Sequence, residues 1–411
     1  MLPEFSPDSW EVPAVQVHNH FSDGWRPEAI QVSGSIQEDT YWDADSILVT
    51  GSVTVEDGVL LTAAPGVEIV FLGFYRFNVQ GAVQAIGTAD EQIRFTSMHS
   101  DLFTADSSFS GCWNGIRFDH TPGTNPVSRF EYCRFEYSKA LSDDPLNMDY
   151  GGGVFYAANV HNLEIENCIF SDNLAHFGGA VFLTHNATPR IINNLFSGNY
   201  ALENASVLYC AYSYPEVTNN TMIDNIILNE LNPYIESCAI LSFIAKPRLT
   251  NNIIRNNDPI LDYMHAQLWQ VKAYYTRHNN IEGYPDTLDN YDFDPLFLGG
   301  GYHPWSLAPE SPAINQGSAD QPWITIPEND LAGLTRQVET SIDLGAYEFS
   351  GNEQLGDVNC DESLDILDIV ALVNMVLYDQ IPPCYALMDL NADNQVNVLD
   401  VIAVINSILD N

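Results

Sequence analysis

The nine residues Ile165–Asn173 read IENCIFSDN, and variants of this stretch return along the chain. Each copy has an apolar residue, a polar pair, and a short β-branched or aromatic run that usually closes on Asn or Ser. The other copies are Phe130–Ser138, Ile191–Asn199, Val217–Asn225, Leu249–Asn257 and the shorter Arg277–Tyr284. Their first residues are 35, 26, 26, 32 and 28 positions apart. A repeat of this size with variable insertions predicts a solenoid.

Each copy predicts a strand, a sharp turn and a second strand, because polar residues that tolerate a left-handed backbone interrupt the apolar run. A further apolar strand follows between copies, at Ala180–Leu183, Val207–Cys210 and Ala239–Ser242. Several short strands within about 26 residues, without a helical period, indicate an all-β fold. We therefore expect a parallel β-helix.

The fourth position of the copies predicts a column of side chains that point into the solenoid. Equivalent residues of neighbouring coils lie about 4.8 Å apart. In such a column each Asn amide can bond the next, which offsets the cost of burying it. The column comprises Cys133, Cys168, Asn194, Asn220, Asn252 and Asn280. A Cys133–Cys168 disulfide fits this spacing, and two buried free thiols are an equally weighted alternative.

The charge balance excludes whole classes of partner. The 411 residues include 55 acidic and 14 basic side chains, a formal charge of −41. Nucleic acids and anionic membrane surfaces would be repelled by such a chain. No run of 18 apolar residues predicts a membrane span. The start does not read as a signal peptide, so we expect any export signal to have been removed or to lie upstream.

The character of the sequence changes several times. Residues 1–30 read as an extended lead-in, 31–349 as the β-helix with its terminal caps, 350–355 as a linker and 356–411 as a separate domain. Two acidic insertions interrupt the repeat and predict exposed loops, where binding residues tend to lie. Their acidic residues are Asp143, Asp144 and Asp149 in the first and Glu230 and Glu236 in the second.

Several stretches resemble secreted bacterial right-handed parallel β-helix proteins. The passage VTVEDGVLLTAAPGVEIVF (residues 53–71) and the stretch Trp113–Phe118 (WNGIRF) are similar to their opening coils, and AHFGGAVFL resembles repeats of polymorphic outer-membrane adhesins. Residues 294–349 resemble the terminal segment of the same β-helix families, which we expect to cover the last coil. There Arg336, Asp343 and Glu348 are expected to form a buried ion-pair cluster. The resemblance implies right-handed coils and an extracellular location.

Residues 357–411 contain a second repeat, offset by 32, that predicts two calcium loops. Each twelve-residue loop carries oxygen-bearing side chains at alternating positions and precedes an apolar helix, the arrangement of an EF-hand-type loop. The first loop supplies Asp357, Asn359, Asp361, Ser363, Asp365 and Asp368. The second supplies Asp389, Asn391, Asp393, Gln395, Asn397 and Asp400. This segment has ten acidic and no basic residues, so its folding should depend on two Ca²⁺ ions.

The segment GDVNCDESLDILD…DLNADNQVNVLD closely resembles a dockerin, a small all-α domain that binds cohesin domains. The resemblance implies a cohesin-like partner. Loop position 6, usually Gly, is Glu362 and Asn394. The partner-contact positions are apolar, which predicts a hydrophobic partner surface or packing on the β-helix itself; they are Ile366, Leu367, Val398 and Leu399. Cys360 and Cys384 are expected to form a disulfide, consistent with an oxidising compartment.

The sequence identifies no catalytic set. Arg190, Lys246 and Arg248 precede strands of successive copies and could form a basic stripe, as a uronan lyase needs, or simply a solvated face. Our preferred hypothesis is a secreted or cell-surface, non-catalytic β-helix scaffold, attached through the calcium module or self-assembling with neighbouring copies. The alternative is a polysaccharide lyase or glycoside hydrolase carried by its dockerin. An aromatic-lined groove with clustered charges would favour the enzyme.

Overall fold

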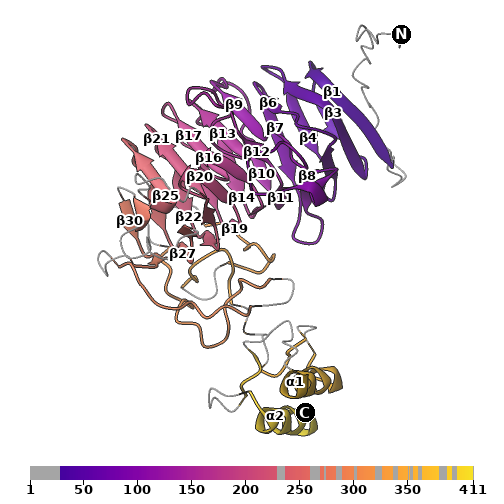
Figure 1. Ribbon diagram of the computed structural model, residues 1–411, viewed down its shortest axis with the longest axis vertical. Coiled ribbons are helices and arrows are strands. Elements are labelled where there is room, and N and C mark those ends of the chain that lie inside the picture. Colours follow the sequence, from indigo (N-terminus) through magenta and orange to yellow (C-terminus); the bar gives the residue numbers. More distant parts are fainter. Residues whose placement is uncertain are drawn as a thin grey trace, which may run out of the picture.

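The computed structural model describes residues 28–228, 237–259, 269–272, 275–283, 289–299, 303–319, 326–336, 341–349, 351, 355–359, 363–378, 387–390 and 396–410. Its main body is a stack of coils, with two helices beyond the last coils (Figure 1). The pairings between the named strands are parallel, and each coil pairs with the next. The predicted parallel β-helix is confirmed.

Each full coil places strands in four rows, taken in chain order. The first row contains β2 (Thr40–Trp42), β4 (Leu60–Ala63), β7 (Ala82–Ile86), β10 (Ser128–Glu131), β14 (Leu163–Glu166), β18 (Arg190–Ile192), β22 (Glu216–Thr218), β26 (Arg248–Thr250) and β30 (Tyr275–Arg277). The second row contains β5 (Glu68–Phe71), β8 (Ile93–Ser97), β11 (Cys133–Glu136), β15 (Ile169–Ser171), β19 (Leu195–Ser197), β23 (Thr221–Ile223), β27 (Ile253–Arg255) and β31 (Asn280–Ile281).

The other two rows close each coil. The third row contains β12 (Lys139–Ala140), β16 (Leu174–Phe177), β20 (Tyr200–Asn204), β24 (Ile226–Ile227) and β28 (Asp258–Pro259). The fourth row contains β6 (Phe77–Val79), β9 (Ile116–Asp119), β13 (Phe155–Ala158), β17 (Val181–Thr184), β21 (Leu208–Ala211), β25 (Ser237–Phe243) and β29 (Trp269–Lys272). At the N-terminal end, β1 (Ala29–Ile36) pairs with β3 (Ser46–Val55), which pairs with both β5 and β6. A 3₁₀ turn, η1, spans Ser100–Leu102.

Left-handed residues make the corners between the first and second rows. Asn167, Asn193, Asn219 and Asn251 have φ between 52° and 60°. Asn adopts this backbone more readily than most residues, which explains its place in every central copy. The corner before the fourth row requires glycine, because a Cβ on Gly179 would lie 2.3 Å from the carbonyl oxygens of Ser206 and Tyr200.

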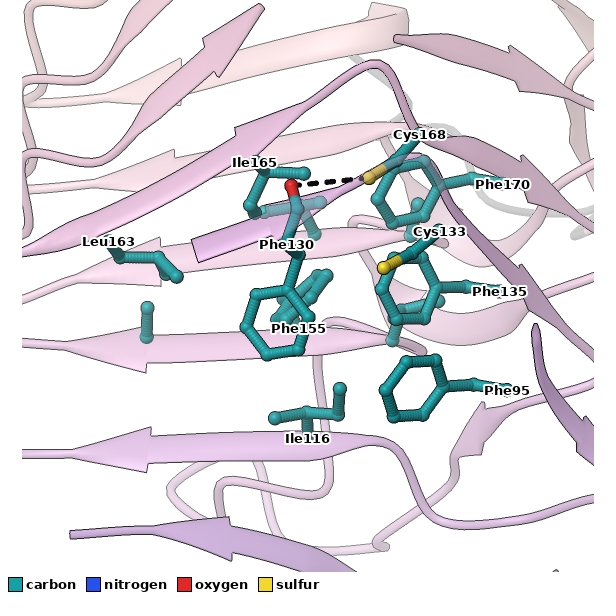
Figure 2. Packing of buried hydrophobic residues seen from close by; sticks show 14 of the residues in the cluster. Phe95, Ile116, Phe130, Cys133, Phe135, Phe155, Leu163, Ile165, Cys168 and Phe170 are labelled. Atoms are coloured by element: carbon teal, nitrogen blue, oxygen red, sulfur yellow. Dashed lines mark hydrogen bonds between the residues drawn. The ribbon is translucent and has the colours of Figure 1, made fainter. Parts of the chain in front are cut away.

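The core is a set of side-chain columns parallel to the solenoid axis. In the second row Phe95, Phe135, Phe170 and Phe196 stack with successive ring-centroid distances of 4.9, 5.0 and 4.4 Å. All four are at most 1% exposed. Figure 2 shows part of this column beside Cys133 and Cys168. Because equivalent positions repeat in each coil, one apolar residue type can fill a whole column.

The inward Asn column forms a hydrogen-bonded ladder. Asn194 Nδ2 donates to Asn220 Oδ1 (2.9 Å), and Asn220 Nδ2 donates to Asn252 Oδ1 (3.0 Å). The next rung is Asn279, to which Asn252 Nδ2 donates at 2.8 Å, so the prediction of Asn280 is wrong by one residue. The reason is register: Thr276, and not Arg277, pairs with the inward-facing Leu249. Asn280 instead donates to the carbonyl of Phe293.

The two Cys of the column are free thiols, and they do not form the disulfide considered above. Cys168 Sγ donates to the carbonyl oxygen of Phe130 at 3.4 Å (Figure 2). Cys133 Sγ donates to the carbonyl oxygen of Ala85 at 3.3 Å. Asn194 Nδ2 makes the same bond to Ile165. Each thiol therefore donates to a carbonyl of the preceding coil, as the Asn amides do. Burial raises the pKa of Cys133 well above its usual value.

A second ladder, which the sequence analysis did not identify, follows the last residue of each copy. Asn173 Nδ2 donates to Asn199 Oδ1 (2.9 Å), Asn199 to Asn225 (2.8 Å) and Asn225 to Asn257 (2.7 Å). Ser138 takes the same place in the preceding coil and donates to Asn173 Oδ1. Two ladders therefore flank the second row and fix both of its corners.

Residues 289–349, hereafter the strap, begin as part of the last coil and then leave it. Tyr291 forms a parallel bridge with Asn280 of the last coil, and Asn280 Nδ2 donates to the carbonyl oxygen of Phe293. Further along the strap, several of its described residues lie at the corners between the first and second rows. Four corner side chains donate to strap carbonyls at 2.9–3.1 Å; they are Tyr132, Asn193, Asn219 and Asn251, bonded to Asp330, Asn329, Asp343 and Ser318.

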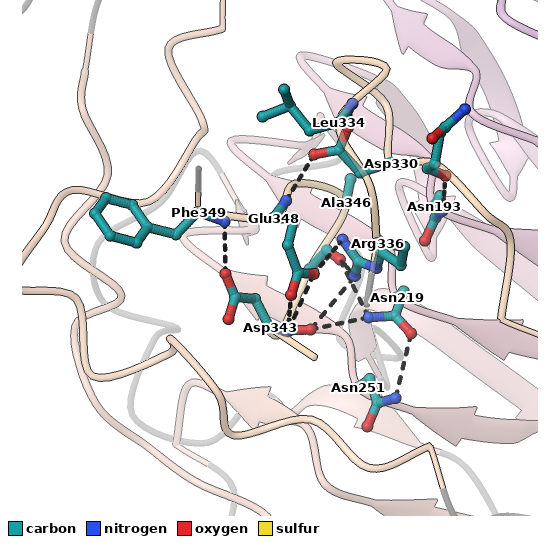
Figure 3. Close-up of polar contacts among 12 residues, drawn as sticks. Asn193, Asn219, Asn251, Asp330, Leu334, Arg336, Asp343, Ala346, Glu348 and Phe349 are labelled. Atoms are coloured by element: carbon teal, nitrogen blue, oxygen red, sulfur yellow. Dashed lines mark hydrogen bonds and ion pairs between the residues drawn. The ribbon is translucent and has the colours of Figure 1, made fainter. Parts of the chain in front are cut away.

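The strap folds around a buried charge cluster (Figure 3). Arg336 Nη1 lies 3.5 Å from Glu348 Oε2, with side-chain exposures of 0% and 3%. Asp343 and Asp330 accept backbone amides nearby. Burial raises the pKa of Glu348 to about 8, an effect that Arg336 opposes. Burial likewise raises the pKa values of Asp343 and Asp330. The expected cluster of Arg336, Asp343 and Glu348 is present.

The C-terminal module, comprising the described residues of 356–411, contains α1 (Ile366–Tyr378) and α2 (Val398–Asp410). Its apolar core includes Val358, Leu372 and Val404, and it joins the strap residues Leu298 and Ala308 in one cluster. No helix of the described ranges has the length and hydropathy that a membrane span requires. The described apolar core of the module therefore packs on the strap.

Candidate functional site

In the C-terminal module, the twelfth residue of each predicted loop is a buried carboxylate. Asp368 and Asp400 are both 0% exposed. Asp368 Oδ1 accepts the amides of Val358 (3.0 Å) and Asn359 (3.2 Å), and Oδ2 accepts that of Asp365 (2.9 Å). Asp400 repeats the pattern with Leu390 (3.0 Å) and Asn397 (2.8 Å). Each carboxylate thus holds both ends of its loop together.

The ninth residue of each loop immediately precedes the following helix. Asp365 Oδ1 accepts the amide of Leu367 at 2.7 Å, and Asn397 Oδ1 accepts that of Leu399 at 2.8 Å. This is the contact of an N-cap, which satisfies an amide that the helix leaves unbonded. In both repeats one oxygen of this side chain is therefore engaged by the helix.

The remaining predicted ligands are divided between described and undescribed residues. Asp357 is buried at 6% exposure, and Asn359, Ser363 and Asp389 also belong to the described residues. Asp361, Asn391, Asp393 and Gln395 lie outside the described residues, as do Cys360 and Cys384. The predicted disulfide and half of the second loop are thus not tested.

The donor set of the module suits a hard cation. Residues 356–411 contain no Lys, Arg or His, so no side-chain cation of the module can offset Asp368 and Asp400. Burying a carboxylate without a compensating charge is costly. Carboxylate and amide oxygens are the ligands that Ca²⁺ prefers. The residues present therefore fit the predicted ion.

The four apolar residues predicted to contact a partner are exposed. Ile366 and Leu367 are 68% and 56% exposed, and Val398 and Leu399 are 58% and 54% exposed. Val370 and Ile402, one helical turn further on, are 51% and 47% exposed. The idea that these residues pack on the β-helix is therefore wrong; the contact with the strap uses other residues. The two repeats present equivalent apolar faces to solvent.

On the solenoid, the outer face of the first row carries alternating charges. Glu164 binds Arg129 (2.6 Å) and Arg190 (3.1 Å), and Arg190 Nε lies 3.5 Å from Glu216. Strand register places Glu216 beside Arg248. The predicted basic stripe is thus interleaved with carboxylates, because the residue before each copy alternates in sign. This pattern neutralises the face that a uronan lyase would need to be positive.

The outer face of the fourth row carries aromatic side chains whose faces are already occupied. Tyr156 stacks on Phe182 with an angle of 9° between the ring planes, and Phe182 stacks on Tyr209 with an angle of 11°. Centroid distances are 5.6 and 5.0 Å. A sugar ring stacks on the face of an aromatic ring, and these faces contact one another along the axis. The rings of this row therefore pack against one another and stabilise the stack of coils.

The first insertion is anchored to the coils at its end. Asp149 binds Arg76 (2.5 Å) and the buried Arg117 (3.1 Å). Burial lowers the pKa of Arg117 to about 10, and Asp149 opposes this shift. Asp144 accepts an amide of its own loop, and Asp143 is exposed. Glu230 and Glu236 of the second insertion lie outside the described residues.

One polar cluster lies beside this anchor. Tyr150 donates to Glu203 Oε1, and His176 Nδ1 lies 3.1 Å from the same oxygen. The rings of Tyr150 and His176 stack with a centroid distance of 4.1 Å. Sequence reasoning missed this cluster, because its members come from three segments that only the coils bring together.

Comparison with known proteins agrees with the solenoid. Residues 93–283 match the family model described as a right handed beta helix region. This region is therefore similar to right-handed β-helices, in agreement with its parallel coils. No curated protein matches the chain, and no solved structure matches it. A β-helix supports both enzymes and non-catalytic proteins, so function has to be argued from the faces described above.

Proposed function

We propose that this chain is an extracellular, non-catalytic β-helix scaffold that is attached through its C-terminal module, a calcium-dependent dockerin-like domain. The observation that carries the proposal is the equivalent exposure of Ile366–Leu367 and Val398–Leu399 at the starts of two helices. Apolar pairs at matching positions of a repeat form a docking surface when nothing within the chain covers them. The expected partner is a cohesin-like domain or a neighbouring copy of this chain.

Calcium dependence follows from the same module. Two Ca²⁺ ions would be held by oxygens of the first and second loops, including Asp357, Asp368, Asp389 and Asp400. The ions would supply the positive charge that these residues lack within the module. Asp368 and Asp400 fasten the loops to α1 and α2, so calcium would control whether the apolar pairs are presented together.

The solenoid faces favour a scaffold over an enzyme. The first row is neutralised by its Arg–Glu alternation, and the aromatic faces of the fourth row are used in stacking. A second candidate, a polysaccharide lyase or glycoside hydrolase, is favoured by the cluster of Tyr150, His176 and Glu203. Activity on acidic polysaccharides that is lost in H176A would support this candidate.

The attachment proposal is tested on the full chain with and without calcium. We expect helical signal to appear on calcium titration, together with either self-association in light scattering or binding to a panel of purified cohesin domains. The variant D368A/D400A should lose both the calcium response and association. Monomeric chain with no cohesin binding at saturating calcium would overturn the proposal.

A matched pair of variants separates docking from folding. L367S/L399S changes the proposed contact, whereas L377S/L409S changes exposed apolar residues at the other ends of the same helices, which are 64% and 77% exposed. We expect both variants to keep the calcium response. Only L367S/L399S should lose association; equal loss in both variants would contradict the assigned surface.

A further inference from the structure

Two His residues lie together at the corner between the fourth row and the next coil. His120 follows β9 directly, and His185 follows β17 directly. Their ring centroids are 5.9 Å apart, and the ring planes meet at 49°. Both residues are exposed. Strand register places one coil, with Asn159, between them, so the proximity comes from the coil stack and not from the sequence.

The same ring nitrogen is engaged in both residues. His120 Nδ1 lies 2.6 Å from Asp119 Oδ1, and His185 Nδ1 lies 3.1 Å from Thr184 Oγ1. Among the described residues, neither Nε2 takes part in a hydrogen bond or ion pair with the protein. A carboxylate on Nδ1 fixes the tautomer in which Nε2 carries the lone pair and increases its strength as a ligand.

The separation of the rings suits a shared metal ion. Zinc–nitrogen bonds of about 2.0–2.1 Å to two imidazoles in tetrahedral geometry place the ring centroids roughly 5–6 Å apart. The observed 5.9 Å lies in this range. All three corner residues, His120, Asn159 and His185, share a left-handed backbone with φ of 57°, 54° and 51°. Their side chains therefore leave the coil at equivalent points of the corner.

We propose that His120 and His185 form a solvent-open site for a transition-metal cation, with Asp119 as the positioning residue of His120. Imidazole nitrogen selects Zn²⁺, Ni²⁺ and Cu²⁺ over Ca²⁺ and Mg²⁺. The site is distinct from the oxygen loops of the C-terminal module. No group of three or more His, Cys, Asp or Glu gathers for a metal in the described part of the chain. The protein thus supplies two ligands, and the other positions remain for water or for a donor from another molecule.

The test is a calorimetric titration of the untagged full chain with ZnCl₂, NiCl₂ or CuCl₂, in saturating calcium so that oxygen ligands are occupied. The background is H18A/H20A, which removes a His-Asn-His triplet as a competing site. We expect one equivalent of bound metal, in the affinity order Cu²⁺ above Ni²⁺ and Zn²⁺, and Ni²⁺ and Zn²⁺ above Mn²⁺. No bound equivalent in this background would overturn the proposal.

Three variants and one control locate the site. H120A and H185A should each abolish the bound equivalent. D119N should weaken binding roughly 10- to 100-fold while leaving the stoichiometry unchanged, as expected when an outer partner of a ligating His is lost. H161A is the matched control, because His161 is exposed and its Nδ1 also contacts a hydroxyl, that of Thr188.

Electron paramagnetic resonance of the Cu²⁺-loaded chain gives an independent readout. Two-nitrogen coordination is expected in the background chain, and none in either His variant. Retention of the equivalent in H120A or H185A, or its loss in H161A, would show that the metal binds elsewhere and would overturn the proposal. If D119N bound the metal as tightly as the background chain, Asp119 would not be a positioning residue of the site.

Discussion

The solenoid and the C-terminal module both bury polar side chains, but they satisfy them differently. In the solenoid, Asn194, Asn220 and Asn252 are neutral and bond one another along a column. In the module, Asp368 and Asp400 are carboxylates bonded to backbone amides, with no basic side chain in the segment. A neutral ladder is complete within the protein, whereas a set of buried carboxylates benefits from a cation.

This difference predicts two kinds of stability. The solenoid should depend on its own repeats and respond little to calcium or salt. The strap is intermediate between the solenoid and the module. It buries three carboxylates, those of Asp330, Asp343 and Glu348, and compensates them with the single guanidinium of Arg336. Three substitutions and one change of pH test this difference in stability, from the largest expected effect to the smallest.

Breaking the ladder in its middle should have the largest effect. Asn220→Ala removes the acceptor of two donors from Asn194 and the donor to Asn252. Leaving several buried polar groups unbonded should lower the free energy of unfolding by about 3–5 kcal/mol. Denaturant titration of the β-sheet signal, with and without calcium, measures the loss. A loss below about 1 kcal/mol would show that packing between coils, and not hydrogen bonding along the ladder, stabilises the column of Asn side chains.

Removing the strap's cation should release the strap and leave the coils folded. Arg336→Met leaves Glu348 buried without its partner, and above pH 8, where this carboxylate is ionised, the cost is about 3–5 kcal/mol. Hydrogen exchange should rise at residues 326–336 and 341–349, and the second row should keep its protection. The double variant R336M/E348Q removes both charges and should recover part of the loss. No recovery would mean that Arg336 acts by packing alone.

Strap docking should also weaken as the pH rises. The pKa of Glu348 is raised from 4.5 to about 8 by burial, so the protonated form is favoured in the docked strap. Its contribution is fully present below pH 4.5 and is lost as the pH rises through about 8. Asp330 and Asp343 shift in the same direction. Limited proteolysis between pH 5 and 9 should show faster cleavage at high pH, and E348Q should flatten this profile.

Neutralising one rung of the outer charge alternation should have the smallest effect. Glu164→Gln breaks pairs with Arg129 and Arg190 on a half-exposed face. We expect a loss of about 0.5–1 kcal/mol at low salt that disappears near 1 M salt. Thermal melts at both salt concentrations measure it. A loss that persists in high salt would indicate that Glu164 contributes by packing.

Much of the solenoid could be predicted from its copies, and the exceptions have physical causes. The position of Asn280 was wrong because the last copy is shorter, so its offset could not be read without the strand register. The signs of Arg129, Glu164, Arg190, Glu216 and Arg248, each one residue before a copy, already contained the charge alternation. Aligning this position across the copies would have excluded the basic stripe.

The sequence alone determined the coil, because corner Asn residues and apolar columns act locally and repeat with the chain. It also predicts the two calcium loops, because oxygen-bearing residues recur in them at fixed spacing. Tertiary structure decided which side the strap covers, whether Cys133 and Cys168 are bonded, and which side chains from distant copies meet, such as His120 and His185. These features depend on the register between coils, which variable insertions set and no single repeat contains.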